Sequence, residues 1–483
     1  MSDNSTLVLF GAKGNLSRIK LIPGLFHLDE AGKLPDEMKI LSVGRQSVSQ
    51  EDWIKTIKSM LDEKFNNQYD QNVFERFIKR NIYHANLPDD PNAFKKFSEL
   101  LLNDDRFPKN FAFFLSVRPS DFALIVDQLA EENLLNEDKY WRRVLIEKPF
   151  GTNLESAINL QESISKHLKE TQIYRIDHYL GKSALQNILW TRFSNSIFEH
   201  MWNNEHIDHI QITNQETLGV GERTQFYDAT GALRDMTQSH LLQMLALTTM
   251  EKPKSFSPDD IRIEKIKLLK SIRPVPIDKI DKYAFRAQYK SGDIEKEGQV
   301  KGYLEELEND KSVVETYAAI KLFIDVPRWK NIPIYLRTAK RLNQSGTFIS
   351  IKFKNNQDNK NSADNWFVFS IQPKESTYFE IQTKVPGLNE VDLRSTKLEG
   401  MNRLDQDEKI DAYETLMLDL LEGNQSRFLH IDEVKAAWSL IDPIIENWTK
   451  NKEKIHQYTA GTSDPKESQV IFENKNQFWR EGN

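Results

Sequence analysis

The chain has 483 residues, 39% of them hydrophobic and 28% charged, and because a single hydrophobic core stops growing at roughly 250–300 residues, we expect two domains. The formal net charge of −7 at pH 7 argues against nucleic acid as a partner. The absence of cysteine excludes disulfides, thiolate nucleophiles and cysteine-ligated zinc, and it is typical of a reducing compartment.

The N-terminal residues carry no signal-peptide pattern. Residues 1–6 are polar without a basic segment, and the apolar run that follows spans only Leu7–Phe10. A longer apolar run, Leu241–Leu247, is still far shorter than the roughly 20 residues of a membrane span. We therefore expect a cytoplasmic protein that is neither exported nor embedded in a membrane.

The first part of the chain, up to about residue 176, alternates short apolar runs with amphipathic stretches. The apolar runs predict strands at Thr6–Phe10, Lys39–Val43, Asn110–Val117 and Arg143–Ile146. The amphipathic stretches predict helices at Asn15–Ala31, Gln50–Glu63, Asn92–Leu102, Ser120–Glu132 and Asn153–Lys169. This alternation is typical of a doubly wound parallel α/β sheet, so we assign residues 1–176 to a Rossmann-like domain.

After residue 177 the predicted strands become longer and the helices gather in separate stretches. We expect strands at His209–Thr217, Ser312–Ile324, Thr347–Phe353, Trp366–Ile371 and Phe379–Val385. The expected helices are Ala229–Thr249, Ala412–Leu421 and Ile431–Trp448, and the polar stretch Asn355–Ala363 predicts a surface loop. This segregation is typical of an α+β domain with a large mixed or partly antiparallel sheet, to which we assign residues 177–483.

A turn containing two glycines follows the first predicted strand. Strand Thr6–Phe10 leads into Gly11-Ala12-Lys13-Gly14-Asn15-Leu16-Ser17 and then directly into a helix. Free backbone N–H groups and a helix N-terminus in such a turn can bind a pyrophosphate, and glycine lets it approach closely. A Gly-x-x-Gly pattern alone is weak evidence because many turns contain glycine, but the flanking strand and helix favour a dinucleotide site.

The end of the second strand bears on which dinucleotide is bound. An acidic residue there would bind the ribose 2′-OH of NAD, whereas an arginine suits the 2′-phosphate of NADP. The chain has Arg45 at this point, and no Asp or Glu follows it before Glu51. Arg45 therefore favours NADP, with an ordinary surface arginine as the alternative.

Two later segments concentrate polar groups after apolar runs. One is Ile146-Glu147-Lys148-Pro149-Phe150-Gly151, and the other is Arg175-Ile176-Asp177-His178-Tyr179-Leu180-Gly181-Lys182. Ligands of open α/β sheets bind beyond the carboxyl ends of the strands. Both segments are therefore candidate binding or catalytic segments.

Within the second of these segments, one stretch of chain can serve two subsites. On extended chain Asp177 and His178 point to opposite sides, and Lys182 returns beside His178 if the segment coils into an α-helix. The donors of His178, Tyr179 and Lys182 suit a phosphate dianion, and Asp177 could orient a distant imidazole. A core role for Tyr179 and a solvated role for Lys182 are the alternatives.

A third segment, residues 228–243, places Asp235 and His240 in an apolar helical stretch. The unperturbed histidine pKa of about 6.5 suits a general base near neutrality. Because the two residues are five apart, an ideal α-helix points them roughly 140° from each other and does not pair them. A hydrogen-bonded core histidine is the alternative for His240.

Together these segments resemble the glucose-6-phosphate dehydrogenases, especially the bacterial ones. The motifs that match in order and spacing are Gly-x-x-Gly-x-Leu from Gly11, Glu147–Gly151, Arg175–Lys182, Glu216–Val220, Arg234–His240, Pro333–Arg341 and Tyr458–Thr462. The resemblance implies oxidation of glucose 6-phosphate at C1 to 6-phosphogluconolactone with hydride transfer to NADP, the first step of the oxidative pentose phosphate pathway. It also implies a homodimer or homotetramer.

The resemblance assigns roles residue by residue. It makes His240 the general base that removes the C1 hydroxyl proton, and it makes Asp177 the residue that orients and stabilises the resulting imidazolium. The residues expected on the substrate phosphate are His178, Tyr179 and Lys182, and those expected around the sugar are Lys20, Lys148, Glu216, Asp235 and Lys340. The expected NADP site comprises Gly11, Lys13, Gly14, Asn15, Leu16, Ser17, Arg45 and Lys148. No metal is expected.

The chain departs from the family pattern in three places. The family usually has Asp-Leu-Ala where this chain has Asn15-Leu16-Ser17, Asn in place of Ser239, and Gly in place of Ala339. Ala339 would be strained if its position needs a positive φ. None of the three removes a group assigned to proton or hydride transfer. The competing interpretations are a dehydrogenase of the glucose–fructose oxidoreductase type, which lacks the 175–182 run, and a non-catalytic sugar-phosphate or NADP sensor, which has no need of a base.

Overall fold

The computed structural model describes residues 3–87, 90–295, 297–355, 364–386, 393–401, 410–451 and 455–482. The chain forms two compact units. Unit 1 is Met1–Lys182, Ser255–Arg262 and Lys409–Val434, and unit 2 is Ser183–Lys254, Ile263–Glu408 and Lys435–Asn483. Unit 1 thus takes two late stretches that no local sequence pattern assigns to it. The predicted loop Asn355–Ala363 lies outside the described residues from residue 356 onward.

Unit 1 is built around a sheet with the order β17-β6-β5-β4-β1-β2-β3 among the described residues. Its strands are β1 Thr6–Phe10, β2 Lys39–Gly44, β3 Asn81–Ala85, β4 Phe111–Leu115, β5 Arg142–Ile146, β6 Ile173–Ile176 and β17 Phe428–Leu429. All neighbours pair in parallel except β17, which runs antiparallel to β6. The doubly wound prediction is confirmed, and the chain order reverses between β1 and β4, where open α/β sheets bind ligands.

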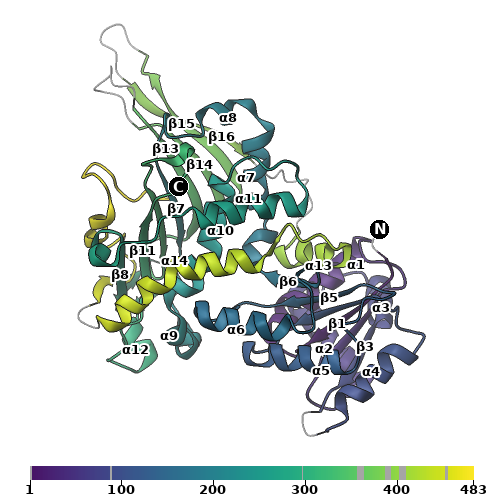
Figure 1. Cartoon of the computed structure of the whole chain (residues 1–483). Coiled ribbons are helices and arrows are strands. Elements are labelled where there is room, and N and C mark those ends of the chain that lie inside the picture. Colours follow the sequence, from purple (N-terminus) through teal and green to yellow (C-terminus); the bar gives the residue numbers. More distant parts are fainter. Residues whose placement is uncertain are drawn as a thin grey trace. The chain divides into compact units, whose positions relative to one another are not determined.

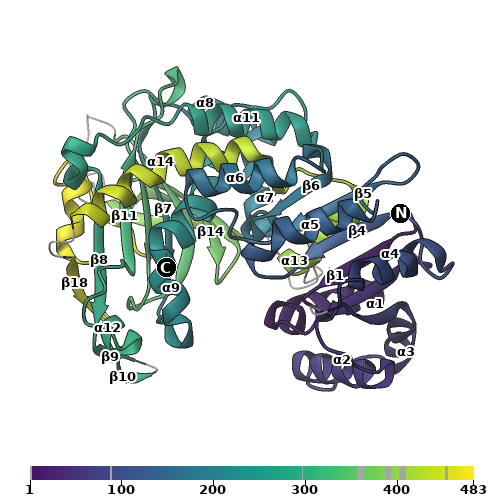
Figure 2. The same cartoon turned by 60° about the horizontal axis from the view of Figure 1, so that its bottom comes forward.

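Helices cover both faces of this sheet (Figures 1 and 2). They are the π-helix η1 Ser17–Leu21, α1 Ile22–Glu30, α2 Gln50–Phe65, α3 Gln71–Arg80, α4 Ala93–Asn103, α5 Phe122–Glu131, α6 Leu154–Ile164 and α13 Ala412–Glu422. Alternation along β1 explains the two layers, because Leu7 and Leu9 join the core formed with α1 and α13 whereas Phe10 stacks on Phe94 of α4. Helix α3 and strand β3 were not among the predicted elements.

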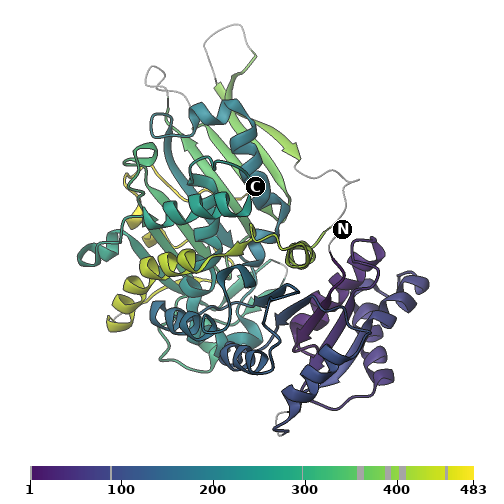
Figure 3. The ribbon, with the colours of Figure 1, turned by 45° about the vertical axis from the view of Figure 1, so that its right-hand side comes forward.

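Unit 2 contains a mixed sheet with the order β16-β15-β14-β13-β7-β12-β11-β8-β18 in the described part of the chain. Its strands are β7 Ile207–Gln215, β8 Ala284–Lys290, β11 Tyr317–Leu322, β12 Ile334–Ala339, β13 Gly346–Phe353, β14 Trp366–Gln372, β15 Ser376–Lys384, β16 Leu393–Met401 and β18 His456–Thr459. Figure 3 shows these strands side by side. The predicted large mixed sheet is confirmed, although β8, β12, β16 and β18 were not among the predicted strands.

Each face of the second sheet is covered by a different part of unit 2. The helices of this part of the chain are α7 Ser183–Ser194, α8 Ser196–Met201, α9 Thr224–Ala232, the π-helix η6 Leu233–Leu241, α10 Leu242–Thr249 and α12 Tyr303–Leu307. Segment η6 packs on β7 and β12, and α7 packs on β14. On β7, the side chains of His209 and Gln211 instead hydrogen-bond to Gln477 and Phe478 of the C-terminal segment. Helices α11 Pro258–Lys270 and α14 Ile431–Lys450 have residues in both units.

No helix in the described ranges is long and apolar enough to cross a membrane. The longest of them, α14, carries Asp432, Glu433 and Lys450 near its ends and a proline at position 443.

A buried arginine ties the late strand β17 to unit 1. Arg175 is 1% exposed and donates to Glu170 at 2.6 Å and to the carbonyl of Leu429 at 3.2 Å. Removing one partner of a buried ion pair leaves the other charge without compensation. We therefore expect Arg175→Met to lower the free energy of unfolding by about 3 kcal/mol in a urea titration followed by circular dichroism.

A matched control is Arg18→Met, which removes an arginine of the same unit that pairs with Glu63 at 3.0 Å. Both of these side chains are about half exposed, so the free energy of unfolding should fall by less than about 1 kcal/mol. Equal losses in the two variants would contradict the role of Arg175 in holding β17.

Candidate active site

The residues singled out by the sequence are divided between the two units. Unit 1 holds the expected cofactor residues together with Lys20, Lys148, Asp177, His178, Tyr179 and Lys182. Unit 2 holds Glu216, Asp235, His240 and Lys340. Each unit therefore carries part of the expected chemistry.

The turn after β1 lies at the switch point of the first sheet. Gly11 has a φ of +79°, and a Cβ at this position would lie 2.0 Å from the carbonyl oxygen of Ser116, just beyond β4. The hydroxyl of Ser17 donates to the carbonyl of Gly11 at 3.0 Å, and the N–H of Gly14 donates to the same carbonyl at 2.8 Å. Only glycine fits position 11, and the turn is held in one conformation at the place where a dinucleotide binds in this fold.

Arg45 is exposed at the end of β2, beside this turn. The ammonium of Lys13, from the turn, donates to the side chain of Gln46 at 3.1 Å, which brings the two segments together. The hydroxyl of Tyr83 donates to the carbonyl of Gln46 at 2.8 Å and steadies the chain there. A guanidinium accessible to solvent thus stands next to the candidate pyrophosphate site, as a 2′-phosphate would require.

The run 175–182 folds differently from the expected α-helical turn. His178–Gly181 is a 3₁₀-helix that begins at Asp177, whose carboxylate accepts from the N–H of Tyr179 at 3.0 Å. The α-helix on which the expected approach of Lys182 to His178 depended does not form, and the Lys182 ammonium lies 3.9 Å from the Tyr179 ring centroid. Asp177 and Tyr179 are buried, and His178 and Lys182 are partly exposed. The side chains of His178 and Lys182 are therefore partly accessible to solvent.

Residues of α13 and its N-cap, which were not among the predicted site residues, complete the surroundings of this turn. The ring of Tyr413 stacks on His178 with a centroid distance of 6.1 Å and an interplanar angle of 7°. The carboxylate of Asp411 accepts from Lys20 at 2.7 Å. No local signal relates positions so far apart in the chain, because only the packing of α13 against unit 1 brings them together.

Glu147, at the end of β5, has an unusual environment. Burial raises its pKa to about 7, although the backbone N–H of Lys148 and the side chain of Tyr413 both hydrogen-bond to the carboxylate and oppose this shift. Its Oε1 is buried and has no hydrogen-bond partner among the described residues. A carboxyl group that changes its charge near neutral pH therefore adjoins Lys148.

Segment η6 brings Asp235 and His240 onto one face. The predicted α-helix would point them roughly 140° apart, but Leu233–Leu241 is a π-helix. In a π-helix residue i bonds to residue i+5, so positions 235 and 240 lie one turn apart, and such turns are frequent at functional sites. His240 is 1% exposed and Asp235 is half-buried. The backbone thus supplies the proximity that an α-helix would have prevented.

The start of this segment is held by a buried carboxylate that the sequence analysis did not single out. The Oε1 atom of Glu315 accepts from the N–H of Leu233 at 2.9 Å. Gly231, two residues before Leu233, has a φ of +75°, and a Cβ at this position would lie 2.6 Å from the same Oε1 atom. Burial raises the pKa of Glu315. The carboxylate therefore caps the helix that carries His240.

Glu216 and Lys340 meet at the ends of two neighbouring strands. Strands β7 and β12 pair in parallel, so the residues that follow them lie at the same edge of the sheet. The ammonium of Lys340 lies 2.5 Å from the carboxylate of Glu216 and 5.6 Å from the ring centroid of Tyr227. Ala339 lies inside β12 without a positive φ, so the strain considered for it does not arise; Arg341 has the positive φ instead, at 54°.

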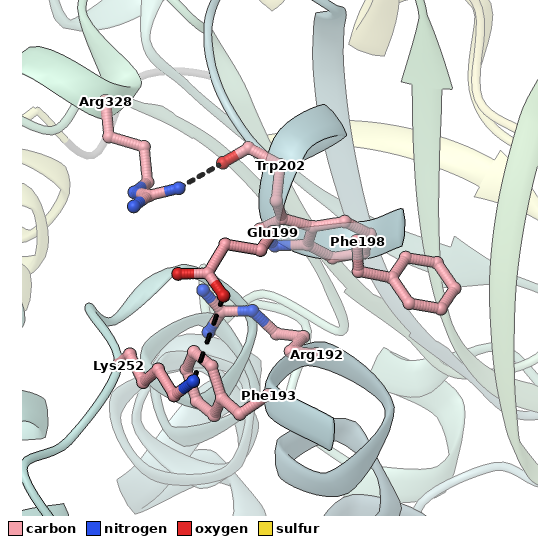
Figure 4. Close-up of a pocket in the computed structure, with 7 residues that line it drawn as sticks. All are labelled: Arg192, Phe193, Phe198, Glu199, Trp202, Lys252 and Arg328. Carbon is pink, nitrogen blue, oxygen red and sulfur yellow. Dashed lines mark hydrogen bonds and ion pairs between the residues drawn. The ribbon is translucent and has the colours of Figure 1, made fainter. Parts of the chain in front are cut away.

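A separate pocket lies in unit 2 (Figure 4), and residues at this pocket hold the end of α10. It is lined by Arg192, Phe193, Phe198, Glu199, Trp202, Lys252 and Arg328. The carbonyls of residues 247–250, where α10 ends, accept at 2.7–2.8 Å from Arg192, Trp202 and Trp329. Because the last four carbonyls of a helix lack partners within it, these side chains act as a cap. None of the expected site residues lines this pocket.

Comparison with known proteins relates both units to one group of proteins. Residues 8–187 match the family description "Glucose-6-phosphate dehydrogenase, NAD binding domain", and residues 189–480 match "Glucose-6-phosphate dehydrogenase, C-terminal domain". The chain is 39% identical to glucose-6-phosphate 1-dehydrogenase of Chlamydia pneumoniae over 98% of this chain and 95% of that one. It is 37% identical to the protein of the same name from Bacillus subtilis over 98% of each. A solved structure of glucose-6-phosphate dehydrogenase in complex with its substrate glucose-6-phosphate has a TM-score of 0.90 at 32% identity and covers 99% of each chain.

The raised pKa of Glu147 makes stability depend on pH. Between the ordinary pKa of 4.5 and the folded value of about 7, the unfolded carboxyl ionises while the folded one stays protonated, which favours unfolding as pH rises. Between pH 5 and pH 8 we expect the free energy of unfolding of the wild type to fall by about 2–3 kcal/mol more than that of Glu147→Gln, as measured by urea denaturation. Glu162→Gln, at an exposed position, is the control and should follow the wild type. Parallel profiles of the wild type and Glu147→Gln would show that Glu147 ionises normally.

Proposed function

The chain belongs to the glucose-6-phosphate dehydrogenase family, and we propose that it uses NADP as the hydride acceptor and His240 as the general base. The reaction is the oxidation of glucose 6-phosphate at C1 to 6-phosphogluconolactone, the first step of the oxidative pentose phosphate pathway. The observation that carries the assignment of this reaction is the match of both family domains, at residues 8–187 and 189–480.

In the proposed mechanism His240 accepts the C1 hydroxyl proton. NADP held at the turn after β1 would supply the acceptor for the hydride released from C1. Two features of unit 2 support the role of His240. The imidazole of His240 is buried away from bulk solvent, and the π-helix places Asp235 one turn away from it, where a carboxylate can bind a neighbouring sugar hydroxyl. For Asp177, the proposed role is to stabilise the protonated base, as in other Asp–His pairs.

For substrate binding we propose the residues that the family resemblance assigns. The partly exposed donors His178 and Lys182, with the hydroxyl of Tyr179, suit the phosphate dianion. The sugar would then contact Lys20, Lys148, Glu216, Asp235 and Lys340. The ion pairs Lys20–Asp411 and Glu216–Lys340 support this assignment, because they hold polar groups in defined positions that can exchange partners with sugar hydroxyls.

The NADP assignment depends on Arg45 and the turn at Gly11. The exposed guanidinium beside the turn supports binding of a 2′-phosphate, and Lys13, Gly14, Asn15, Leu16, Ser17 and Lys148 complete the proposed cofactor site. We also propose a cytoplasmic location, supported by the absence of cysteine, and a homodimer or homotetramer, supported by the family resemblance.

The proposed base is tested with His240→Asn. Formation of NADPH from glucose 6-phosphate and NADP is followed by absorbance, and we expect kcat to fall by about 10³-fold because a general base typically contributes 10²–10⁴. The control is His206→Asn, the same substitution at an exposed histidine of unit 2, which should keep full activity. A folded wild type that binds both ligands without turnover would instead identify a sensor.

The cofactor preference is tested with Arg45→Ala. Loss of a charge-assisted hydrogen bond to the 2′-phosphate should lower kcat/KM with NADP by about 10- to 100-fold. Since NAD lacks this phosphate, kcat/KM with NAD should change by less than about 2-fold, which makes NAD the internal control. An equal loss with both dinucleotides would refute the assignment of Arg45 to the 2′-phosphate.

A further inference from the structure

The loop that follows β7, residues 216–221, is fastened to the chain that follows β12. The N–H of Leu342 donates to the carbonyl of Glu216 at 3.0 Å, and the N–H of Arg341 donates to the carbonyl of Leu218 at 3.2 Å. These bonds continue the pairing of the two strands into the loop. The 216–221 loop is therefore an extension of the sheet edge that carries Glu216.

The side chain of Arg341 lies under this loop. It is 11% exposed, and its guanidinium pairs with Glu297 at 2.6 Å and with Glu306 at 3.5 Å. It also donates to the carbonyl of Thr217 at 3.4 Å. A Cβ on Gly219 would lie 2.5 Å from its Nε, so the loop can lie this close only because residue 219 is glycine.

The far end of the loop is bound to one of the same carboxylates. The N–H of Gly221 donates to Glu306 at 3.2 Å, and the hydroxyl of Tyr289 donates to Glu306 at 2.5 Å. That hydroxyl in turn accepts from the N–H of Val220 at 3.1 Å. Arg341 thus neutralises a carboxylate that holds the loop at its other end.

The backbone of Arg341 is left-handed, with a φ of +54°. For a residue with a Cβ this conformation is strained and persists only where the surroundings determine it. Lys340, the preceding residue, directs its ammonium to Glu216, while Arg341 directs its guanidinium to Glu297 and Glu306. Two successive cations therefore hold the same loop through different carboxylates.

We propose that Arg341 is a positioning residue for the sugar site, where it holds the 216–221 loop so that Glu216 and Lys340 keep the geometry that binds the substrate. This role rests on the proposed function, in which these two residues contact the sugar. Because the contacts of Arg341 are with the loop and two carboxylates, its loss acts on substrate binding rather than on hydride transfer.

The test is Arg341→Gly, because glycine adopts a φ of +54° without strain while the guanidinium is removed. We expect KM for glucose 6-phosphate to rise about 10-fold, with kcat and KM for NADP changed by less than about 2-fold. Arg341→Lys keeps the charge but loses the planar guanidinium, and its KM for glucose 6-phosphate should lie between those of the wild type and Arg341→Gly. The control is Arg273→Gly, which removes an arginine of the same unit that pairs with Asp325 at an exposed site, and it should behave as wild type.

An active Arg341→Gly variant with unchanged KM for glucose 6-phosphate would overturn the proposal. So would equal losses in all kinetic constants together with a lower melting temperature, since general destabilisation does not distinguish the two ligands. If Arg341→Gly does not fold, Glu297→Gln removes the partner carboxylate and should raise the same KM about 3-fold, whereas no change would overturn the role. A wild type that fails to oxidise glucose 6-phosphate would refute the proposed function itself.

Discussion

The buried guanidinium of Arg175 joins two distant parts of unit 1, and the candidate site there depends on that junction. Its bonds to Glu170 and to the carbonyl of Leu429 hold β17 beside β6, the strand that ends at Asp177. The late stretch that contains β17 also contains α13, which places Tyr413 against His178. An interior charge needs fixed partners, so the late stretch occupies one position on the sheet.

Unit 2 uses a different device to hold its candidate base. The helix that carries His240 is capped at its start by Glu315 and, beyond η6, at the end of α10 by Arg192, Trp202 and Trp329. Caps at both ends satisfy the backbone N–H and C=O groups that lack partners within the helix. The π-helical segment lies between these caps and keeps positions 235 and 240 on one face.

Much of the fold was predictable because its signals are local. Apolar runs such as Thr6–Phe10 and Trp366–Ile371 form strands β1 and β14, and Ala412–Leu421 forms α13, whose N-terminus is capped by Asp411. The missed elements carry weaker local patterns. Strand β16 is an exposed edge with little apolar alternation, and β12 lies within a segment that the sequence analysis used only as a motif.

The sequence by itself determined the two kinds of domain, the turn at Gly11 and the identity of the candidate groups, because periodicity and residue chemistry are properties of short segments. Tertiary structure alone decided that residues 409–434 belong to unit 1, that Asp411 pairs with Lys20, and that burial raises the pKa of Glu147. It also replaced the expected α-helical geometry at Asp235 and His240 by a π-helix. These outcomes depend on contacts between segments far apart in the chain, which no local pattern encodes.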